Sequence, residues 1–155
     1  MLIYRKYRLL LAIAAIFLVF GSSQNAFARE IVLKDLSGQP VSISDYKGKP
    51  VILFFWTTWC PFCRKELKKL NERYAAIAGD GIVVLGVNVS EQEKKVQNFF
   101  KGYQLNFPML LDRTGALADK YDVLGVPTLV LLDENGSLVS LSHELPADYK
   151  RLLLR

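Results

Sequence analysis

The most constraining feature of the sequence is the segment 51–66, in which an apolar run leads into two cysteines and then into a helical pattern. Residues 51–56 are continuously apolar, which is typical of a strand buried on both faces. Two residues separate Cys60 from Cys63, and the chain has no other cysteine. The segment therefore predicts a buried strand that ends at a Cys-x-x-Cys pair on the first turn of a helix.

The start of this helix favours reactive chemistry at the first cysteine. Pro61 suits the first helical turn, where its missing N–H group costs no hydrogen bond. Cys60 then lies at the helix N-terminus, where free N–H groups and the helix dipole favour an anion, so its thiol should ionise readily. A cysteine pair this close in sequence is a poor cross-link for an exported fold, so we interpret it as a redox couple.

The first 28 residues have the composition of a targeting segment. Arg5, Lys6 and Arg8 precede an apolar run at 9–20, and an Ala-Phe-Ala triplet ends at Ala28. This layout predicts a signal peptide. The alternative is a short N-terminal membrane anchor, although the apolar run is shorter than the ~20 residues that span a bilayer. We expect residues 29–155 to form the domain, in a periplasmic or other extracytoplasmic location.

The charges give no support for nucleic-acid binding. The chain has 20 basic and 15 acidic residues, and three of the basic ones lie in the first 28 residues. Without that segment the net charge is about +2, and no basic patch is left in the sequence. A structural zinc site needs four ligands, whereas the chain has two cysteines and one histidine. We expect no nucleic acid, no metal and no cofactor.

The remaining chain predicts alternating strands and helices. Strands are expected at 31–33, 41–43, 51–56, 82–89, 107–111, 129–132 and 137–141, and helices at 61–78, 90–101, 112–121 and 146–153. Ser44 or Asp45 should cap a single helical turn, and a capping box of Ser90 and Glu93 should begin the 90–101 helix. This order predicts an α/β fold with a mixed sheet, in which the β-α-β part is parallel and the terminal hairpin antiparallel.

Further motifs make this pattern specific. Trp59 directly precedes the cysteine pair, and Gly-Val-Pro-Thr follows at 125–128. With these motifs and Asn-Phe-Pro at 106–108, the chain resembles the TlpA/ResA/CcmG (DsbE) group of extracytoplasmic thiol–disulfide oxidoreductases over essentially all of residues 29–155. The resemblance implies a thioredoxin fold with a mixed central sheet flanked by helices, an N-terminal strand pair, and a helix and strand inserted at 90–111.

The resemblance also implies roles for individual residues. Cys60 is the expected exposed nucleophile that attacks a substrate disulfide, and Cys63 the buried thiol that resolves the mixed disulfide. Pro127 is an expected cis-proline, with Val126 presenting its backbone groups to an extended substrate. The other side chains expected to contact the substrate are Trp59, Pro61 and Phe62. Trp59 has the alternative of being an ordinary core residue.

Glu66 is the expected acid–base residue. It lies three residues after Cys63 and matches the acidic residue that tunes the site in this group. Phe54 stands where thioredoxin itself has a buried aspartate, so Glu66 is the nearby carboxylate left for proton transfer. The alternative is a solvated Glu66 that pairs with Lys69. His143, in a polar Ser-His-Glu stretch, is expected to be a solvated loop residue.

The expected function is an exported enzyme that reduces disulfides of partner proteins, such as apocytochrome c, through its dithiol. The resemblance implies a monomer recharged by a membrane electron donor of the CcdA or DsbD type. Two alternatives stay open: a thiol-dependent chaperone or metallochaperone, and a peroxiredoxin-type peroxidase. The peroxidase pattern has a proline where this chain has Leu53, although Thr57 fits its threonine.

Overall fold

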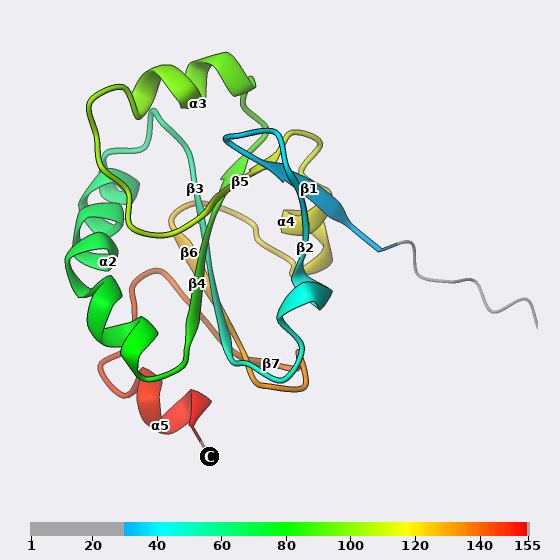
Figure 1. Cartoon of the computed structure of the whole chain (residues 1–155), viewed down its shortest axis with the longest axis vertical. Helices are drawn as coiled ribbons and strands as arrows, with labels where there is room; N and C mark the ends of the chain where they lie inside the picture. Colours follow the sequence, from blue (N-terminus) through cyan, green and yellow to red (C-terminus); the bar gives the residue numbers. More distant parts are fainter. Residues whose placement is uncertain (1–29, 155) are drawn as a thin grey trace, which may run out of the picture. The chain divides into compact units, whose positions relative to one another are not determined.

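A mixed sheet forms the centre of the fold, which is seen in a computed structural model that describes residues 30–154 (Figure 1). Its strands are β1 (Val32–Asp35), β2 (Pro40–Ser42), β3 (Val51–Trp56), β4 (Val83–Val89), β5 (Met109–Asp112), β6 (Thr128–Leu132) and β7 (Leu138–Ser142). The strands lie in the order β2-β1-β5-β4-β3-β6-β7. The expected signal peptide or anchor at 1–28 lies outside the described residues.

Helices cover both faces of this sheet. They are the 3-10 turn η1 (Ile43–Tyr46) and the α-helices α2 (Pro61–Gly79), α3 (Glu93–Phe99), α4 (Ala116–Lys120) and α5 (Tyr149–Leu153). In Figure 1, α2 and α4 lie on opposite sides of the sheet. Across residues 30–154, none of the helices combines the length and the apolar character needed to cross a membrane.

The strand pairing confirms the expected mixed topology. β3 pairs in parallel with β4, and β4 in parallel with β5. β6 is antiparallel to both β3 and β7, so the terminal hairpin is as expected. β1 and β2 form the expected N-terminal antiparallel pair, and β1 joins the sheet through β5. The inserted segment therefore supplies α3 and also the strand that connects the N-terminal pair to the sheet.

The apolar run of β3 is buried on both faces, as its continuous pattern predicts. Each of its residues is at most 3% exposed. The even-numbered residues of β3 pack in one core with α2 and α5, and the odd-numbered residues pack in a second core with α4. Phe54 belongs to the first core and is fully buried. The position where thioredoxin has an aspartate is thus an apolar packing position in this protein.

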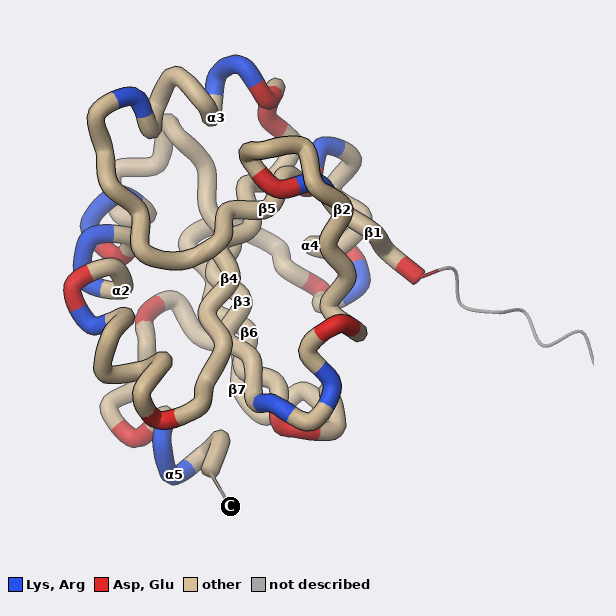
Figure 2. The backbone as a smooth tube through the Cα atoms, viewed as in Figure 1, with Lys and Arg blue, Asp and Glu red and all other residues tan. Residues whose placement is uncertain are grey.

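Most charged side chains lie outside these two cores; among the described residues, Glu66, Glu91 and Asp112 are buried. β3, β4 and β6 carry no Lys, Arg, Asp or Glu, whereas acidic and basic residues alternate along α2 (Figure 2). Lys68 and Glu72 form one exposed i,i+4 ion pair on this helix, with 3.9 Å between the charged atoms. Such pairs contribute little to stability, so the burial of apolar side chains dominates the packing of α2.

Two helix caps differ from those expected. The cap of η1 is Ser42 rather than Ser44 or Asp45, and Asp45 is instead the third helical residue, whose carboxylate accepts the Ser42 N–H at 2.8 Å. The expected capping box of Ser90 and Glu93 is wrong. Ser90 has a left-handed backbone (φ 55°), and its N–H donates to the carbonyl of Asp112 at 2.9 Å. This contact with the end of β5 delays the helix start to Glu93.

The last two helices are shorter than expected. Asp112 is the end of β5 rather than the start of a helix. Its Oδ2 accepts the backbone N–H groups of Leu117 and Ala118 at 3.0 and 2.9 Å. Asp112 therefore caps the first turn of α4 although it lies outside that helix in the sequence. The C-terminal helix begins at Tyr149 instead of residue 146.

Gly86 in β4 leaves no room for a side chain. A methyl group at this position would overlap the thioether of Met109, which is 2% exposed and whose Sδ accepts a hydrogen bond from Trp56 Nε1 at 2.9 Å. We predict that Gly86→Ala lowers the free energy of unfolding by about 1–3 kcal/mol, the usual cost of overpacking a core.

The matched control is Gly79→Ala in α2, where a methyl group would enter open space. Alanine is the better helix former, so no loss of stability is expected from this substitution. Urea denaturation of the two variants measures the difference. Equal midpoints would contradict the close packing at Gly86.

Candidate active site

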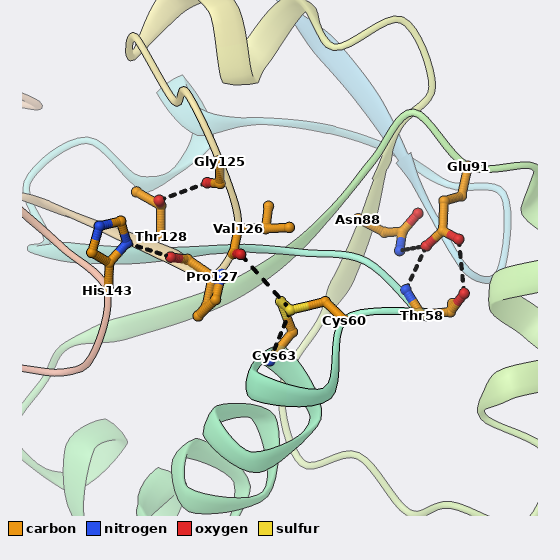
Figure 3. Close-up of a disulfide and its surroundings, with 10 residues drawn as sticks. All are labelled: Thr58, Cys60, Cys63, Asn88, Glu91, Gly125, Val126, Pro127, Thr128 and His143. Atoms are coloured by element: carbon orange, nitrogen blue, oxygen red, sulfur yellow. Dashed lines mark hydrogen bonds between the residues drawn. A yellow bond between two sulfur atoms is a disulfide. The ribbon is translucent and has the colours of Figure 1, made fainter.

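The two cysteines lie where β3 passes into α2 (Figure 3). Cys60 is the N-cap of α2, and Pro61 is the first helical residue. The two cysteines form a disulfide with 5.2 Å between their Cα atoms. The N–H group of Cys63 points at Cys60 Sγ from 3.1 Å. After reduction, this N–H and the helix dipole would favour a thiolate at Cys60.

The two cysteines differ in exposure less than expected. Cys63 is fully buried, as predicted, but Cys60 is only 4% exposed. The expected exposure of Cys60 is therefore wrong for the disulfide form. Its Sγ is bonded to Cys63, and the carbonyl oxygen of Val126 lies 3.8 Å away. In the disulfide form only a small part of Cys60 is therefore open to solvent.

Two aromatic side chains next to the cysteines in the sequence are exposed. Trp59 is 63% exposed and Phe62 is 74% exposed. This exposure excludes the alternative that Trp59 is a core residue. Large exposed aromatic side chains are common at protein interaction sites. Contact of Trp59, Pro61 and Phe62 with a substrate remains a prediction.

The loop at residues 125–128, called the 125–128 loop below, faces the disulfide. The peptide bond between Val126 and Pro127 is cis, as the sequence predicted. The Thr128 hydroxyl donates to the carbonyl of Gly125 at 2.8 Å, which closes the loop from within. Figure 3 shows the Val126 carbonyl pointing at Cys60. The loop therefore brings a backbone carbonyl next to the sulfur expected to react.

Glu66 is buried, with 5% of the residue exposed, so the solvated alternative is wrong. Its Oε2 accepts from Lys69 Nζ at 3.1 Å, and its Oε1 accepts the backbone N–H of Leu145 at 3.2 Å. The hydrogen bond with Glu66 raises the pKa of the Lys69 ammonium. Glu66 thus makes the expected pair with Lys69 while it is shielded from solvent. Its proton transfer with Cys63 stays a prediction.

His143 has a role that sequence reasoning missed. Its ring is exposed, as expected of a loop residue, but Nδ1 lies 2.8 Å from the carbonyl oxygen of Pro127 (Figure 3). The two residues are 16 positions apart, and they meet because β6 and β7 pair with Leu129 opposite Ser142. No local sequence pattern places His143 beside the loop, because the contact depends on the register of the terminal hairpin.

Glu91 is a second residue that sequence reasoning missed. It is buried, and it accepts the backbone N–H of Thr58 at 2.6 Å and the Thr58 hydroxyl at 2.7 Å. It also accepts from Asn88 Nδ2 at 2.8 Å and from Lys95 Nζ at 2.7 Å. The carboxylate therefore binds the loop before Cys60 to the end of β4 and to α3. No local pattern in the sequence marks this contact.

The environment of Glu91 favours its charged form. Burial by itself would raise the pKa of this carboxyl group. Hydrogen bonds from Lys95, Asn88 and Thr58 outweigh the burial and hold the pKa of Glu91 below its ordinary value. Glu91 is thus a carboxylate at neutral pH.

Two surface pockets border the 125–128 loop. The pocket on the side of Pro127 is lined by Phe62, Lys65, Glu66, Lys69, Pro127, His143 and Glu144. The pocket on the side of Val126 includes Trp59 and the fully exposed Leu124. Within residues 30–154, no three Cys, His, Asp or Glu side chains are grouped so that they could hold a metal ion.

Fold and site together define a class of protein. A Cys-x-x-Cys disulfide at a helix N-terminus, facing a cis-proline loop at the same end of a mixed sheet, is the arrangement of thioredoxin-fold thiol–disulfide oxidoreductases. Residues 25–141 match the model of the AhpC/TSA family, and the chain belongs to this family.

Known proteins support a closer relationship. The chain is 36% identical over 136 residues to the thiol–disulfide oxidoreductase ResA of Bacillus subtilis. The matched region covers 84% of this chain and 76% of that protein. The chain spans slightly less than two thirds of several other curated relatives of that name, 65%, 65% and 64% of their length. The expected resemblance to the ResA group is confirmed.

Two solved structures have the same fold. StoA of Bacillus subtilis superposes with a TM-score of 0.66 at 35% identity, over 76% of this chain and 90% of that one. A secreted disulfide oxidoreductase of Mycobacterium tuberculosis, described as homologous to E. coli DsbE, superposes with a TM-score of 0.65 at 30% identity, over 76% and 85% of the two chains. The protein is thus a thiol–disulfide oxidoreductase of the ResA/DsbE type.

The lowered pKa of Glu91 leads to a pH-dependent prediction. Its contribution to stability is fully present above the unfolded pKa of about 4.3 and is lost as the pH falls through the lower folded value. We predict that Glu91→Gln lowers the free energy of unfolding at pH 7 by about 1–3 kcal/mol, because buried donors lose a charged acceptor. The difference from the wild type should shrink below about pH 4.

Denaturant unfolding at a series of pH values measures this difference. The control is Glu72→Gln, which removes only the exposed pair with Lys68 and should cost less than about 1 kcal/mol. If the loss in Glu91→Gln is the same at neutral and at acid pH, the charged form of Glu91 is not what stabilises the loop.

Proposed function

We propose that this protein is an extracytoplasmic enzyme that reduces disulfides of exported proteins. The observation that carries the proposal is the Cys60–Cys63 disulfide at the N-terminus of α2, next to the backbone carbonyl of Val126. The targeting pattern in residues 1–28 and the secreted relative from Mycobacterium tuberculosis support the location.

The first step is attack on the substrate by the reduced enzyme. Cys60 acts as a thiolate, stabilised by the N-terminus of α2 and the N–H of Cys63. It attacks one sulfur of the substrate disulfide, the substrate S–S bond breaks, and the second substrate sulfur leaves as a thiolate that takes up a proton. The product of this step is a mixed disulfide between Cys60 and the substrate.

The second step releases the reduced substrate. Glu66 accepts the proton of the Cys63 thiol, and the Cys63 thiolate attacks Cys60 Sγ. The mixed disulfide breaks, and the substrate leaves with both sulfurs reduced and protonated. Two electrons have passed from the enzyme dithiol to the substrate, and the enzyme is left with the Cys60–Cys63 disulfide seen in the structure.

The proposed substrate is an extended polypeptide with a disulfide, such as oxidised apocytochrome c. It lies against the backbone of Val126 and Pro127 and contacts the side chains of Trp59, Pro61 and Phe62. A membrane electron donor of the CcdA or DsbD type then reduces the enzyme again. The protein acts as a monomer. Support for these partners comes from the resemblance to the ResA group.

A trapping experiment tests the order of the two cysteines. Cys63→Ser should accumulate mixed disulfides with insulin, because no thiol remains to resolve them, whereas Cys60→Ser should accumulate none. Non-reducing gel electrophoresis and mass spectrometry detect the adducts. Adducts of Cys60→Ser alone would reverse the proposed roles.

Further measurements separate this function from its alternatives. The wild type should catalyse insulin reduction without consuming peroxide, and its midpoint potential should lie below that of the glutathione couple. Peroxide consumption that depends on Cys60 would favour a peroxidase. Stable binding of cysteine-containing polypeptides without electron transfer would favour a chaperone. A potential well above that of glutathione would indicate an oxidant.

Substitution of Glu66 tests its role in proton transfer. Glu66→Gln should slow the resolution of the mixed disulfide at neutral pH by about tenfold or more, since general acid–base catalysis contributes at least this much. Rapid-mixing kinetics measure the rate, and Glu72→Gln on the same helix is the control. If Glu66→Gln leaves the rate and the titration of both cysteines unchanged, Glu66 has no such role.

A further inference from the structure

The turn at the end of β7, residues 142–145, contacts the active site from two directions. His143 Nδ1 lies 2.8 Å from the carbonyl oxygen of Pro127, in the loop that faces Cys60. The backbone N–H of Leu145 donates to Glu66 Oε1 at 3.2 Å, on the helix that carries both cysteines. The 142–145 turn therefore connects the 125–128 loop to α2.

The position of His143 explains why a side chain makes this contact. The pairing of β6 with β7 ends with Leu129 opposite Ser142. After Ser142 the chain turns, and the Ser142 hydroxyl donates to the carbonyl of Glu144 at 2.8 Å. The imidazole of His143 thus reaches Pro127 where the backbone ladder has stopped. The hydrogen bond from His143 therefore adds one contact between the end of β7 and the 125–128 loop, beyond the last paired residues.

The chemistry of the two groups fixes which ring nitrogen carries a proton. The oxygen of Pro127 is a carbonyl and can only accept a hydrogen bond. Nδ1 of His143 is therefore the donor, and in the neutral ring Nε2 is left as an acceptor. This bond persists in the charged ring, since Nδ1 carries a proton in both forms.

The turn itself is held firmly. The side chain of Leu145 is 8% exposed and belongs to the same core as both cysteines. Lys69 bonds to Glu66 and lies 3.8 Å from the carboxylate of Glu144. These contacts fix the position of the turn that carries His143. The charged groups that line the pocket beside the ring are Lys65, Glu66, Lys69 and Glu144.

We propose that His143 is a positioning residue that holds the 125–128 loop ready to receive a polypeptide substrate. This inference rests on the proposed function, because it concerns the reduction of disulfides in polypeptides. A polypeptide needs the backbone of Val126 in place beside Cys60, and small displacements of positioning groups cost affinity or rate. A small disulfide needs only the sulfur of Cys60. His143 therefore affects the binding of polypeptide substrates, but not of small disulfides, and leaves the chemistry of the cysteines unchanged.

Three variants at one position test the inference. His143→Ala removes the donor. His143→Asn keeps an N–H donor at about the position of Nδ1, whereas the longer amide of His143→Gln places its donor closer to the position of Nε2. Saturation kinetics of insulin reduction, with dithiothreitol as electron donor, give kcat and KM. The rate with DTNB, a small aromatic disulfide, and the midpoint potential report on the cysteines, and thermal unfolding reports on stability.

The expected result is a change in KM for the polypeptide only. His143→Ala should raise the KM for insulin about three- to tenfold, the effect of one ordinary hydrogen bond. The kcat, the DTNB rate and the midpoint potential should match the wild type. His143→Asn should restore the wild-type KM, and His143→Gln should not. This pattern separates positioning from a loss of stability, which would not depend on the size of the substrate.

Other outcomes overturn the inference. An unchanged KM for insulin in His143→Ala, in an enzyme whose wild type reduces both substrates, overturns the role of His143 and leaves the proposed function intact. A parallel loss with insulin and DTNB, or a shifted potential, shows that His143 acts on the cysteines instead. A wild type that reduces neither substrate overturns the proposed function, and this inference with it.

Discussion

The pairing of β3 with its two neighbours controls the geometry of the active site. β3 lies between β4 and β6, and all of its side chains are buried in one of the two cores. Cys60 follows a short loop after the end of this strand. Phe55 of β3 is paired with Thr128 of β6, so Pro127 lies beside the same end of the sheet. The contacts that build the core thus also bring the 125–128 loop to the disulfide.

Polar contacts position the segments around the active site that the apolar core does not hold. The loop before Cys60, the 125–128 loop and the first turns of α2 each lie at the end of an apolar element. Glu91, His143 and Glu66 bind these three segments through hydrogen bonds, which are buried for Glu91 and Glu66 and exposed for His143. Bonds to charged groups are stronger than neutral ones, and a buried acceptor that loses its donors is costly. These residues give the site a defined shape at positions where apolar packing cannot.

The inserted segment has consequences beyond its own helix. β5 joins the N-terminal strand pair to the sheet, and the residues between β4 and α3 provide Glu91. The expected capping box at Ser90 does not form. The Ser90 N–H donates to the carbonyl of Asp112, and the Glu91 carboxylate accepts from the Thr58 N–H. A helix start depends on local hydrogen bonds, and long-range partners competed successfully for them here.

The sequence by itself determined the features that depend on neighbours along the chain. These are the double-sided burial of β3, the cysteine pair at the start of α2, and the motif that carries the cis bond before Pro127. Only the tertiary structure decided how Cys60 is covered, that Glu66 is buried, and that His143 and Glu91 hold the site. The physical reason is that each of these depends on strand register and on hydrogen bonds between residues far apart in sequence, which local composition and spacing do not encode.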